Sequence, residues 1–314
     1  MFGRNGCHKR RRENIMNYLL GIDVGTSATK TVLFDEKGTV IASASQEYPL
    51  YQPENGWAEQ KPEDWRDAVL KTIKEVVSQS GVDKDAVKGI GISGQMHGLV
   101  MLDEAGEVIR PSIIWCDQRT GAEVEDMLKI MPREEWIRIT ANPPLTGWTA
   151  AKILWVRKNE PENYNCCRHI LLPKDYIRYI LTGVFATEVS DASGMQLLDV
   201  PGRCWSDEVL EALKIDKNLL GKVYESCEAT GTLLPEVAQE LGLSESCVVA
   251  GGAGDNAAAA VGTGVVKDGT AFTTIGTSGV VFAHTSKPAI DPKGRIHTCC
   301  CAVPGAWHMM GVTQ

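Results

Sequence analysis

The chain has 314 residues, 43% of them hydrophobic and 23% charged, which is enough apolar material for one large domain or two ordinary ones. Its net charge of −8 argues against a nucleic-acid partner and against binding to anionic membranes, because such surfaces attract basic proteins. The ten cysteines include no Cys-x-x-Cys pair, and Cys299, Cys300 and Cys301 are contiguous in an apolar stretch. We therefore expect these cysteines to be small core side chains rather than metal ligands.

The first 16 residues form a basic leader. It is followed by too few apolar residues to be a secretory signal. Only about four apolar residues follow the cluster Lys9-Arg10-Arg11-Arg12 before Gly21. We expect residues 1–16 to be disordered and the protein to be cytoplasmic. Two interpretations of the leader stand, a tail that touches an acidic partner or an extension upstream of a true start at Met16, and we favour the extension.

Apolar runs bounded by turn residues predict strands in the first third of the chain. The expected strands are 18–24, 29–35, 39–49, 88–93 and 99–103. Pro62 opens a helix that runs to about residue 79, because Trp65, Val69, Ile73 and Val76 recur every three to four residues on one face. Three strands, a helix and a further strand predict the start of an α/β domain.

A helical middle and a β-rich end follow. Helical spacing occurs at 119–129, 150–157 and 174–181, a strand-like run occurs at 170–172, and a short helix at 236–242 ends in glycine. Residues 222–235 are polar and rich in turn residues. We expect a domain boundary near residue 245, before a strand that leads to Asp255.

Three glycine-rich turns carry the chemistry that the sequence predicts. Gly25-Thr26-Ser27 and Gly276-Thr277-Ser278 each interrupt a β-rich run, and their backbone N–H groups and hydroxyls suit phosphate oxygens. Gly254-Asp255-Asn256 delivers a carboxylate at the end of a strand. Each turn alone is weak evidence, because glycine and serine also serve hairpin geometry and Asp255 is also a plausible helix cap. Neither phosphate turn has the pattern of a P-loop.

Several ordered motifs across nearly the whole chain resemble the FGGY family of sugar kinases. They are Gly91–Gly98 (Gly-Ile-Ser-Gly-Gln-Met-His-Gly), Ile114–Thr120, Ala186–Gly194, Gly254-Asp255-Asn256 and Ala302–His308. The resemblance implies an α/β protein with the actin-like, ribonuclease-H-like ATPase fold, which has two lobes. It also implies an N-terminal kinase domain at 17–246 and the beginning of a C-terminal domain at 247–314, so the second lobe looks truncated.

The resemblance also implies roles for single residues. Asp255 would be the catalytic base, Met96 and His97 would bind the sugar, and Asn256 would hold a neighbouring hydroxyl. Asp23 lies at the end of the first strand, where it would reach Mg²⁺ through water or, alternatively, serve only as a turn-forming residue. The two Gly-Thr-Ser turns would line the ATP phosphates, and Asp191 and Ser193 would shape the floor of the cleft or bind water near the sugar.

The block around Met96 and His97 is similar to that of family members that phosphorylate D-xylulose, and it differs from that of glycerol kinase. We therefore expect ATP-dependent conversion of D-xylulose to D-xylulose 5-phosphate, with no nucleic-acid or membrane partner and a possible homodimer of a full-length form. Met195 and Cys301 depart from the family pattern and weaken the choice of substrate. The alternatives are another pentulose or hexonate kinase, or a non-catalytic sugar-binding domain. We expect the chain alone to self-associate and to lack ATP turnover, because its second lobe is short.

Overall fold

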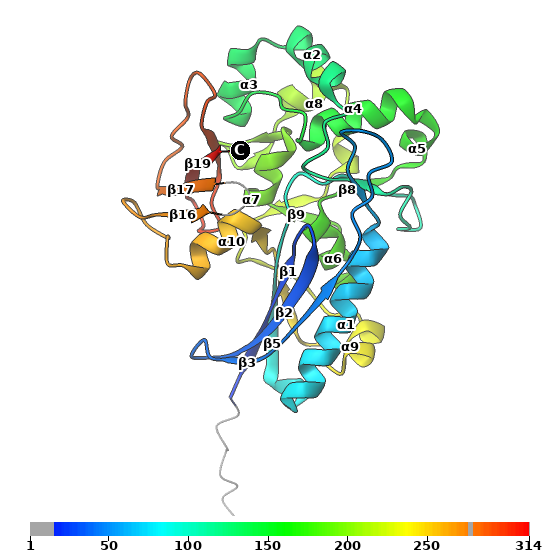
Figure 1. Ribbon diagram of the computed structural model, residues 1–314, viewed down its shortest axis with the longest axis vertical. Helices are drawn as coiled ribbons and strands as arrows, with labels where there is room; N and C mark the ends of the chain where they lie inside the picture. Colours follow the sequence, from blue (N-terminus) through cyan, green and yellow to red (C-terminus); the bar gives the residue numbers. More distant parts are fainter. Residues whose placement is uncertain (1–15, 276–278, 314) are drawn as a thin grey trace, which may run out of the picture.

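The structure, a computed structural model, describes residues 16–275 and 279–313. Its main feature is a seven-stranded sheet (Figure 1). The first strands of the chain form most of this sheet, and strands after residue 228 complete it. The strands of this sheet are β1 (Tyr18–Val24), β2 (Ala28–Asp35), β3 (Val40–Glu47), β5 (Val87–Gly94), β13 (Ala229–Thr232), β14 (Val248–Ala250) and β15 (Ala253–Gly254). The order is β13-β14-β5-β1-β2-β3, and β15 pairs with the end of β5.

The centre of this sheet is parallel, whereas its edges are antiparallel. β1, β2 and β3 form an antiparallel meander, while β1 runs parallel to β5 and β5 runs parallel to both β14 and β15. Three parallel strands therefore end at the same edge. The chain positions that follow these strands are the positions of the predicted turns.

Helix α1 (Pro62–Ser80) covers one face of the sheet. Proline occupies its first turn with Glu63 and Asp64, which suits the positive end of the helix dipole. The apolar stripe predicted from the sequence is buried against Leu20, Ile22 and Leu33 of the sheet. Gly81 ends the helix in a left-handed conformation, and its N–H donates to Val77 O.

A mainly helical region connects β5 to β13 and packs around its own core, which includes Trp136 and Leu197. Its helices are α2 (Gly121–Ile130), α3 (Arg133–Thr140), α4 (Thr149–Asn159), α5 (Pro161–Cys166), α6 (Pro173–Thr182), α7 (Val189–Ala192) and α8 (Asp207–Leu213). Short strand pairs join it: β4 (Glu59–Gln60) with β7 (Ser112–Ile113), β6 (Val100–Leu102) with β8 (His169–Leu171), β10 (Leu198–Asp199) with β11 (Cys204–Trp205), and β9 (Ala186–Glu188) with β12 (Lys222–Tyr224).

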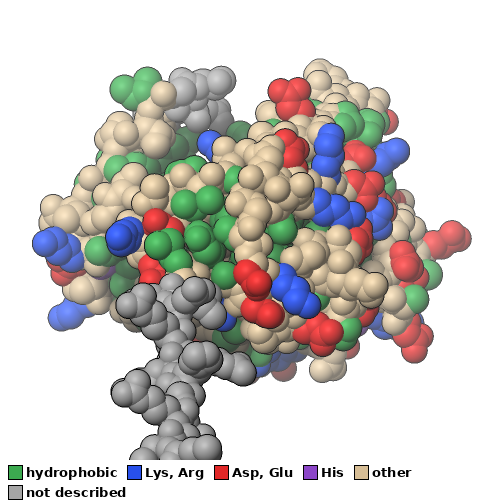
Figure 2. Space-filling model, turned by 90° about the horizontal axis from the view of Figure 1, so that it is seen from below, with side chains coloured by type: hydrophobic (Ala, Val, Ile, Leu, Met, Phe, Trp, Pro, Cys, Tyr) green, Lys and Arg blue, Asp and Glu red, His purple; other side chains and the backbone are tan. Residues whose placement is uncertain are grey.

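The last part of the described chain forms a second, four-stranded antiparallel sheet. After α9 (Pro235–Leu241) and α10 (Asp255–Gly262), the order is β16 (Ala271–Ile275), β17 (Gly279–Thr285), β19 (Trp307–Thr313) and β18 (His297–Cys300). Cys299, Cys300 and Cys301 are buried, as expected for core side chains. On the face seen in Figure 2, acidic and basic side chains are interspersed around a hydrophobic area.

Each strand and helix expected from the sequence is present with ends within two residues of the expected ones. The interpretation of 222–235 as turns was wrong in part, because β12 and β13 lie there and pair with the distant strands β9 and β14. The first sheet continues through β14 and β15, beyond the boundary expected near residue 245. The division of the chain at residue 246 therefore stays a prediction, and the leader at 1–15 lies outside the described residues.

Two glycines with the same backbone conformation test how tightly this sheet is packed. Gly252 has a φ of 79°, and a Cβ there would lie 2.1 Å from Ile92 O, whereas Gly264 has a φ of 76° and no described atom within 4 Å of that position. We expect Gly264→Ala to lower the free energy of unfolding by about 1–2 kcal/mol, the cost of a left-handed alanine. Gly252→Ala adds a clash with backbone, so its loss should exceed about 3 kcal/mol in urea unfolding. Equal losses would contradict the packing described for β14 and β15.

Candidate active site

The register of the three parallel strands brings the predicted turns together. Asp23 of β1 pairs with Ser93 of β5, which pairs with Ala253 of β15. One residue further, Val24, Gly94 and Gly254 form the next row. The turn at Gly25, the pair Met96-His97 and the carboxylate of Asp255 therefore leave the sheet side by side.

Asp255 is the first residue of α10, and its side chain is accessible to solvent. Its Oδ1 accepts hydrogen bonds from the backbone N–H of Asn256 at 2.6 Å and from Asn256 Nδ2 at 2.9 Å. Surrounding protein atoms that displace water raise the pKa of Asp255 to about 6, and the charge of Asp23 raises it further while the Asn256 bonds oppose the shift. A carboxylate with such a pKa is ionised at neutral pH and is basic enough to take a proton from a hydroxyl.

The turn after β1 is held through its carbonyl groups. Gly25 O accepts hydrogen bonds from Tyr48 OH and from Gln95 Nε2, and Thr26 O accepts one from Gln60 Nε2 at 2.7 Å. Trp115 Nε1 donates to Thr26 Oγ1 at 2.9 Å. Because the carbonyl groups are occupied by protein donors, the turn is rigid. The other predicted phosphate turn, Gly276-Thr277-Ser278, lies outside the described residues.

Met96 and His97 pack tightly against Gly254 and Gly194, two glycines from distant motifs. A Cβ at Gly254 would lie 2.9 Å from Met96 Sδ, and one at Gly194 would lie 2.5 Å from His97 Nδ1. His97 has a φ of 66°, which is uncommon for a residue with a side chain. Its Nδ1 lies 2.8 Å from Gly194 O, and its ring stacks on Trp148 with centroids 4.9 Å apart.

The surroundings of His97 keep its imidazole neutral. Burial lowers the pKa of His97 to about 3, and the nearby Lys152 and His297 lower it as well, while the hydrogen bond with Gly194 acts in the opposite direction. A neutral imidazole carries one N–H and one lone pair. It therefore suits hydrogen bonds with uncharged hydroxyl groups better than with an anion.

Asp191 and Ser193, which we expected at the floor of the cleft, are fully buried behind it. Ser193 Oγ donates to Val189 O and accepts from the backbone N–H of Cys300, and Asp191 Oδ2 lies 3.3 Å from Lys174 Nζ. The expectation was wrong because a local motif does not reveal on which side of the backbone the side chains lie. These residues support the site and do not face it.

Sequence reasoning missed three residues near these turns. Trp148 and Lys152 flank His97, and Lys30 faces Asp23 across the β1–β2 pair. Lys152 had a signal in the sequence, since it is a charged residue in the otherwise apolar run Ala150–Leu154. Strand alternation alone does not tell whether Lys30 points to the site or to solvent.

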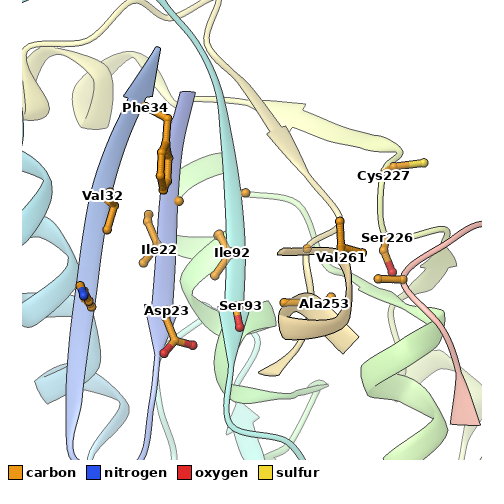
Figure 3. Close-up of a pocket in the computed structure, with 16 residues that line it drawn as sticks. Ile22, Asp23, Val32, Phe34, Ile92, Ser93, Ser226, Cys227, Ala253 and Val261 are labelled. Atoms are coloured by element: carbon orange, nitrogen blue, oxygen red, sulfur yellow. The ribbon is translucent and has the colours of Figure 1, made fainter. Parts of the chain in front are cut away.

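A cavity of about 420 Å³ adjoins the site on the sheet face opposite α1 (Figure 3). Asp23 and Ser93 lie at one end of it, and apolar side chains such as Val32, Phe34 and Val261 line the rest. Helix α10 forms one wall. The cavity therefore extends from Asp23 along the sheet.

Residues 18–262 match the N-terminal domain of the FGGY family of carbohydrate kinases. The chain belongs to this family. It is 42% identical to the xylulose kinase of Escherichia coli (strain K12) and 40% identical to that of Bacillus subtilis (strain 168), and the matches cover 93% and 95% of this chain. The chain spans about 60% of the length of these FGGY relatives.

A solved structure shows the same fold. The xylulose kinase of Rhodospirillum rubrum matches 94% of this chain with a TM-score of 0.90 and 27% sequence identity, and the match covers 60% of that kinase. The actin-like α/β fold expected from the sequence is thus confirmed for the FGGY chain. In the described ranges, none of the helices is both long and apolar enough to cross a membrane. Those ranges also hold no group of three or more His, Cys, Asp or Glu side chains suited to a metal ion.

The raised pKa of Asp255 has a measurable consequence for stability. Because its folded pKa of about 6 exceeds the unfolded value of 3.8, ionised Asp255 destabilises the fold above about pH 6 and costs nothing below about pH 4. Asp255→Asn should therefore raise the free energy of unfolding at pH 8 by about 1 kcal/mol, a modest gain because the side chain is exposed to solvent. The gain should disappear at pH 4 in urea unfolding.

Asp268 provides a control, because its pKa is shifted in the opposite direction from that of Asp255. Hydrogen bonds from the Ser286 side chain and backbone lower its pKa, so its ionised form stabilises the fold at neutral pH. Asp268→Asn should lower stability at pH 8, and the loss should shrink as the pH falls below the unfolded pKa. A gain for Asp255→Asn that did not depend on pH would contradict the electrostatic explanation.

Proposed function

We propose that this chain carries the sugar site and part of the phosphate site of an ATP-dependent kinase that converts D-xylulose to D-xylulose 5-phosphate. The observation that carries the proposal is the position of Asp255. A carboxylate that is basic at neutral pH directly follows Gly254, the glycine on which Met96 packs, and Met96 precedes the neutral His97 in the chain. Membership of the FGGY family and the similarity to xylulose kinases support the choice of reaction and sugar.

In the proposed reaction, Asp255 is the general base. Its carboxylate takes the proton of the attacking sugar hydroxyl while the hydroxyl oxygen forms a bond to the γ-phosphorus of ATP. The bond from that phosphorus to the bridging oxygen breaks, and ADP leaves with the electron pair. Asn256 and His97 would orient the sugar by hydrogen bonds to its other hydroxyls, and Met96 would pack on its carbon skeleton.

The phosphates of ATP need donors and a cation, because the chain itself is acidic. Gly25, Thr26 and Ser27 would contact phosphate oxygens, and the role of Gly276, Thr277 and Ser278, which lie outside the described residues, stays a prediction from the sequence. Asp23 is exposed, its carboxylate has no hydrogen-bond or ion-pair partner among the described residues, and it lies near Asp255, so these residues fit Mg²⁺ bound through water. Mg²⁺ would neutralise charge on the transferring phosphate.

Other sugars remain alternatives in this proposal. A different pentulose or a hexonate would fill the same site if the departures at Met195 and Cys301 altered the pocket. A non-catalytic sugar-binding domain would bind sugar without ATP turnover. A homodimer of a longer form and a location in the cytoplasm also stay predictions.

The sugar proposal is tested by binding to the chain itself. We expect isothermal titration calorimetry to show that D-xylulose binds more tightly than D-ribulose, gluconate or glycerol. His97→Ala should weaken D-xylulose binding by about 1–3 kcal/mol, because a buried hydrogen bond is lost. If gluconate or D-ribulose bound more tightly than D-xylulose, the substrate would instead be a hexonate or another pentulose.

The catalytic role of Asp255 is tested in a chimera that joins this chain to the part of the Escherichia coli relative that follows the matched region. Asp255→Asn should lower D-xylulose-dependent ADP formation by about 10²-fold or more while the sugar KM stays within a few fold. Asp268→Asn serves as the matched control and should leave turnover unchanged. Near-normal turnover of the Asp255→Asn chimera would show that another group is the base.

A further inference from the structure

Helix α4 holds His97 by both its ring and its backbone. The ring stacks on Trp148, the residue that precedes the helix. The carbonyl oxygen of His97 accepts two hydrogen bonds from the first turn of α4, from Thr149 Oγ1 at 3.1 Å and from Lys152 Nζ at 2.7 Å. A left-handed residue with a side chain is strained, so it persists only where its surroundings hold it.

The hydrogen bond with Gly194 determines which nitrogen of His97 carries the proton. A carbonyl oxygen only accepts, so Nδ1 must be the N–H donor to Gly194 O in the neutral ring. Nε2 then carries the lone pair. This atom has no hydrogen-bond partner in the described part of the chain. It is not among the buried polar atoms that lack a partner, so it is accessible from outside the protein. The imidazole therefore offers an open acceptor.

Lys152 is placed unusually for a lysine. It is fully buried, its neighbours Ala151 and Ile153 are buried apolar residues, and no carboxylate of the described chain lies within 4 Å of its Nζ. Burying an ammonium group without an ion-pair partner is costly. Its one hydrogen bond in the described chain goes to the carbonyl of His97.

We propose that Lys152 is a positioning residue for sugar binding: its hydrogen bond to the His97 carbonyl holds the left-handed turn in which Nε2 accepts a hydrogen bond from a substrate hydroxyl. The substrate class is a neutral polyol or ketose whose hydroxyl donates a hydrogen bond to this nitrogen. The inference rests on the proposed function, since it concerns the same sugar site. It adds a residue that does not touch the sugar and a direction for the hydrogen bond.

The test compares variants of Lys152 in calorimetric titrations of the chain with D-xylulose. Lys152→Met keeps the length of the side chain but removes the donor, and it should raise the Kd about tenfold. Lys152→Gln keeps an N–H donor and should stay within about threefold of the wild type. Lys158→Met, which changes an exposed lysine on the same helix, is the control and should leave the Kd unchanged.

A double-mutant cycle separates positioning from general loss of structure. If Lys152 acts through His97, Lys152→Met should have almost no further effect on Kd in the His97→Ala background. If the double variant raised the Kd by the product of the two single effects, the inference would be overturned. If Lys152→Met does not fold, Thr149→Val removes the other donor to the same carbonyl and should raise the Kd in the same direction.

The ring of His97 gives a second readout by ¹⁵N NMR. The free chain should show Nδ1 protonated and Nε2 unprotonated at pH 7, and D-xylulose should shift the Nε2 signal. An Nε2–H form would overturn the inference. If the wild type does not bind D-xylulose, the proposed substrate fails; if it binds and Lys152→Met binds equally well, only the role of Lys152 fails.

Discussion

The parallel alignment of β1, β5 and β15 is the constraint on which the site depends. Their ends lie in one row, and that row is packed so closely that side chains are excluded from part of it. A Cβ at Gly94 would lie 3.2 Å from Val24 O and 3.2 Å from Lys174 Cβ. Glycine at this position therefore serves the close approach of the strands and of α6, and it sets the spacing between the turn at Gly25 and the turn at Met96.

The same close packing joins motifs that are far apart in the chain. Gly254 makes room for Met96, and Gly194 makes room for the ring of His97. Asp255 follows Gly254 directly, so the position of the carboxylate and that of the Met-His pair are not independent. A shift of either glycine-bearing segment would move both the base and the sugar contacts.

Local signals in the sequence were sufficient for most of the fold and placed the turns at Gly25 and Gly254 after strands, as the structure has them. The apolar stripe of α1 and the strand before Asp255 are short-range patterns, and the structure contains them. The strands β12 and β13 were missed because they are short and contain almost no buried apolar residues, so no apolar run marks them. The contribution of Lys152 depends on α4 crossing behind His97, which no local pattern shows. The family resemblance identified the Met-His pair, but it did not indicate that Asp191 is buried.

The turn that carries Asp255 is anchored from behind by buried charges. Arg178 donates to Gly251 O at 3.0 Å, and the N–H of Gly254 donates to Ser190 Oγ at 3.1 Å, which in turn donates to Glu188. Lys174 lies among three carboxylates, those of Asp175, Glu188 and Asp191.

This cluster avoids an excess of buried negative charge. Burial, with the neighbouring acids Asp175 and Glu188, raises the pKa of Asp191 well above its ordinary value even though Lys174 opposes the shift. The raised pKa of Asp191 reduces the negative charge that the cluster carries beside Lys174 and Arg178. The backbone on both sides of the Gly251–Gly254 turn is hydrogen-bonded to this group through Arg178 and Ser190. The turn that precedes Asp255 is therefore held by buried partners that solvent does not reach, while Asp255 itself stays exposed.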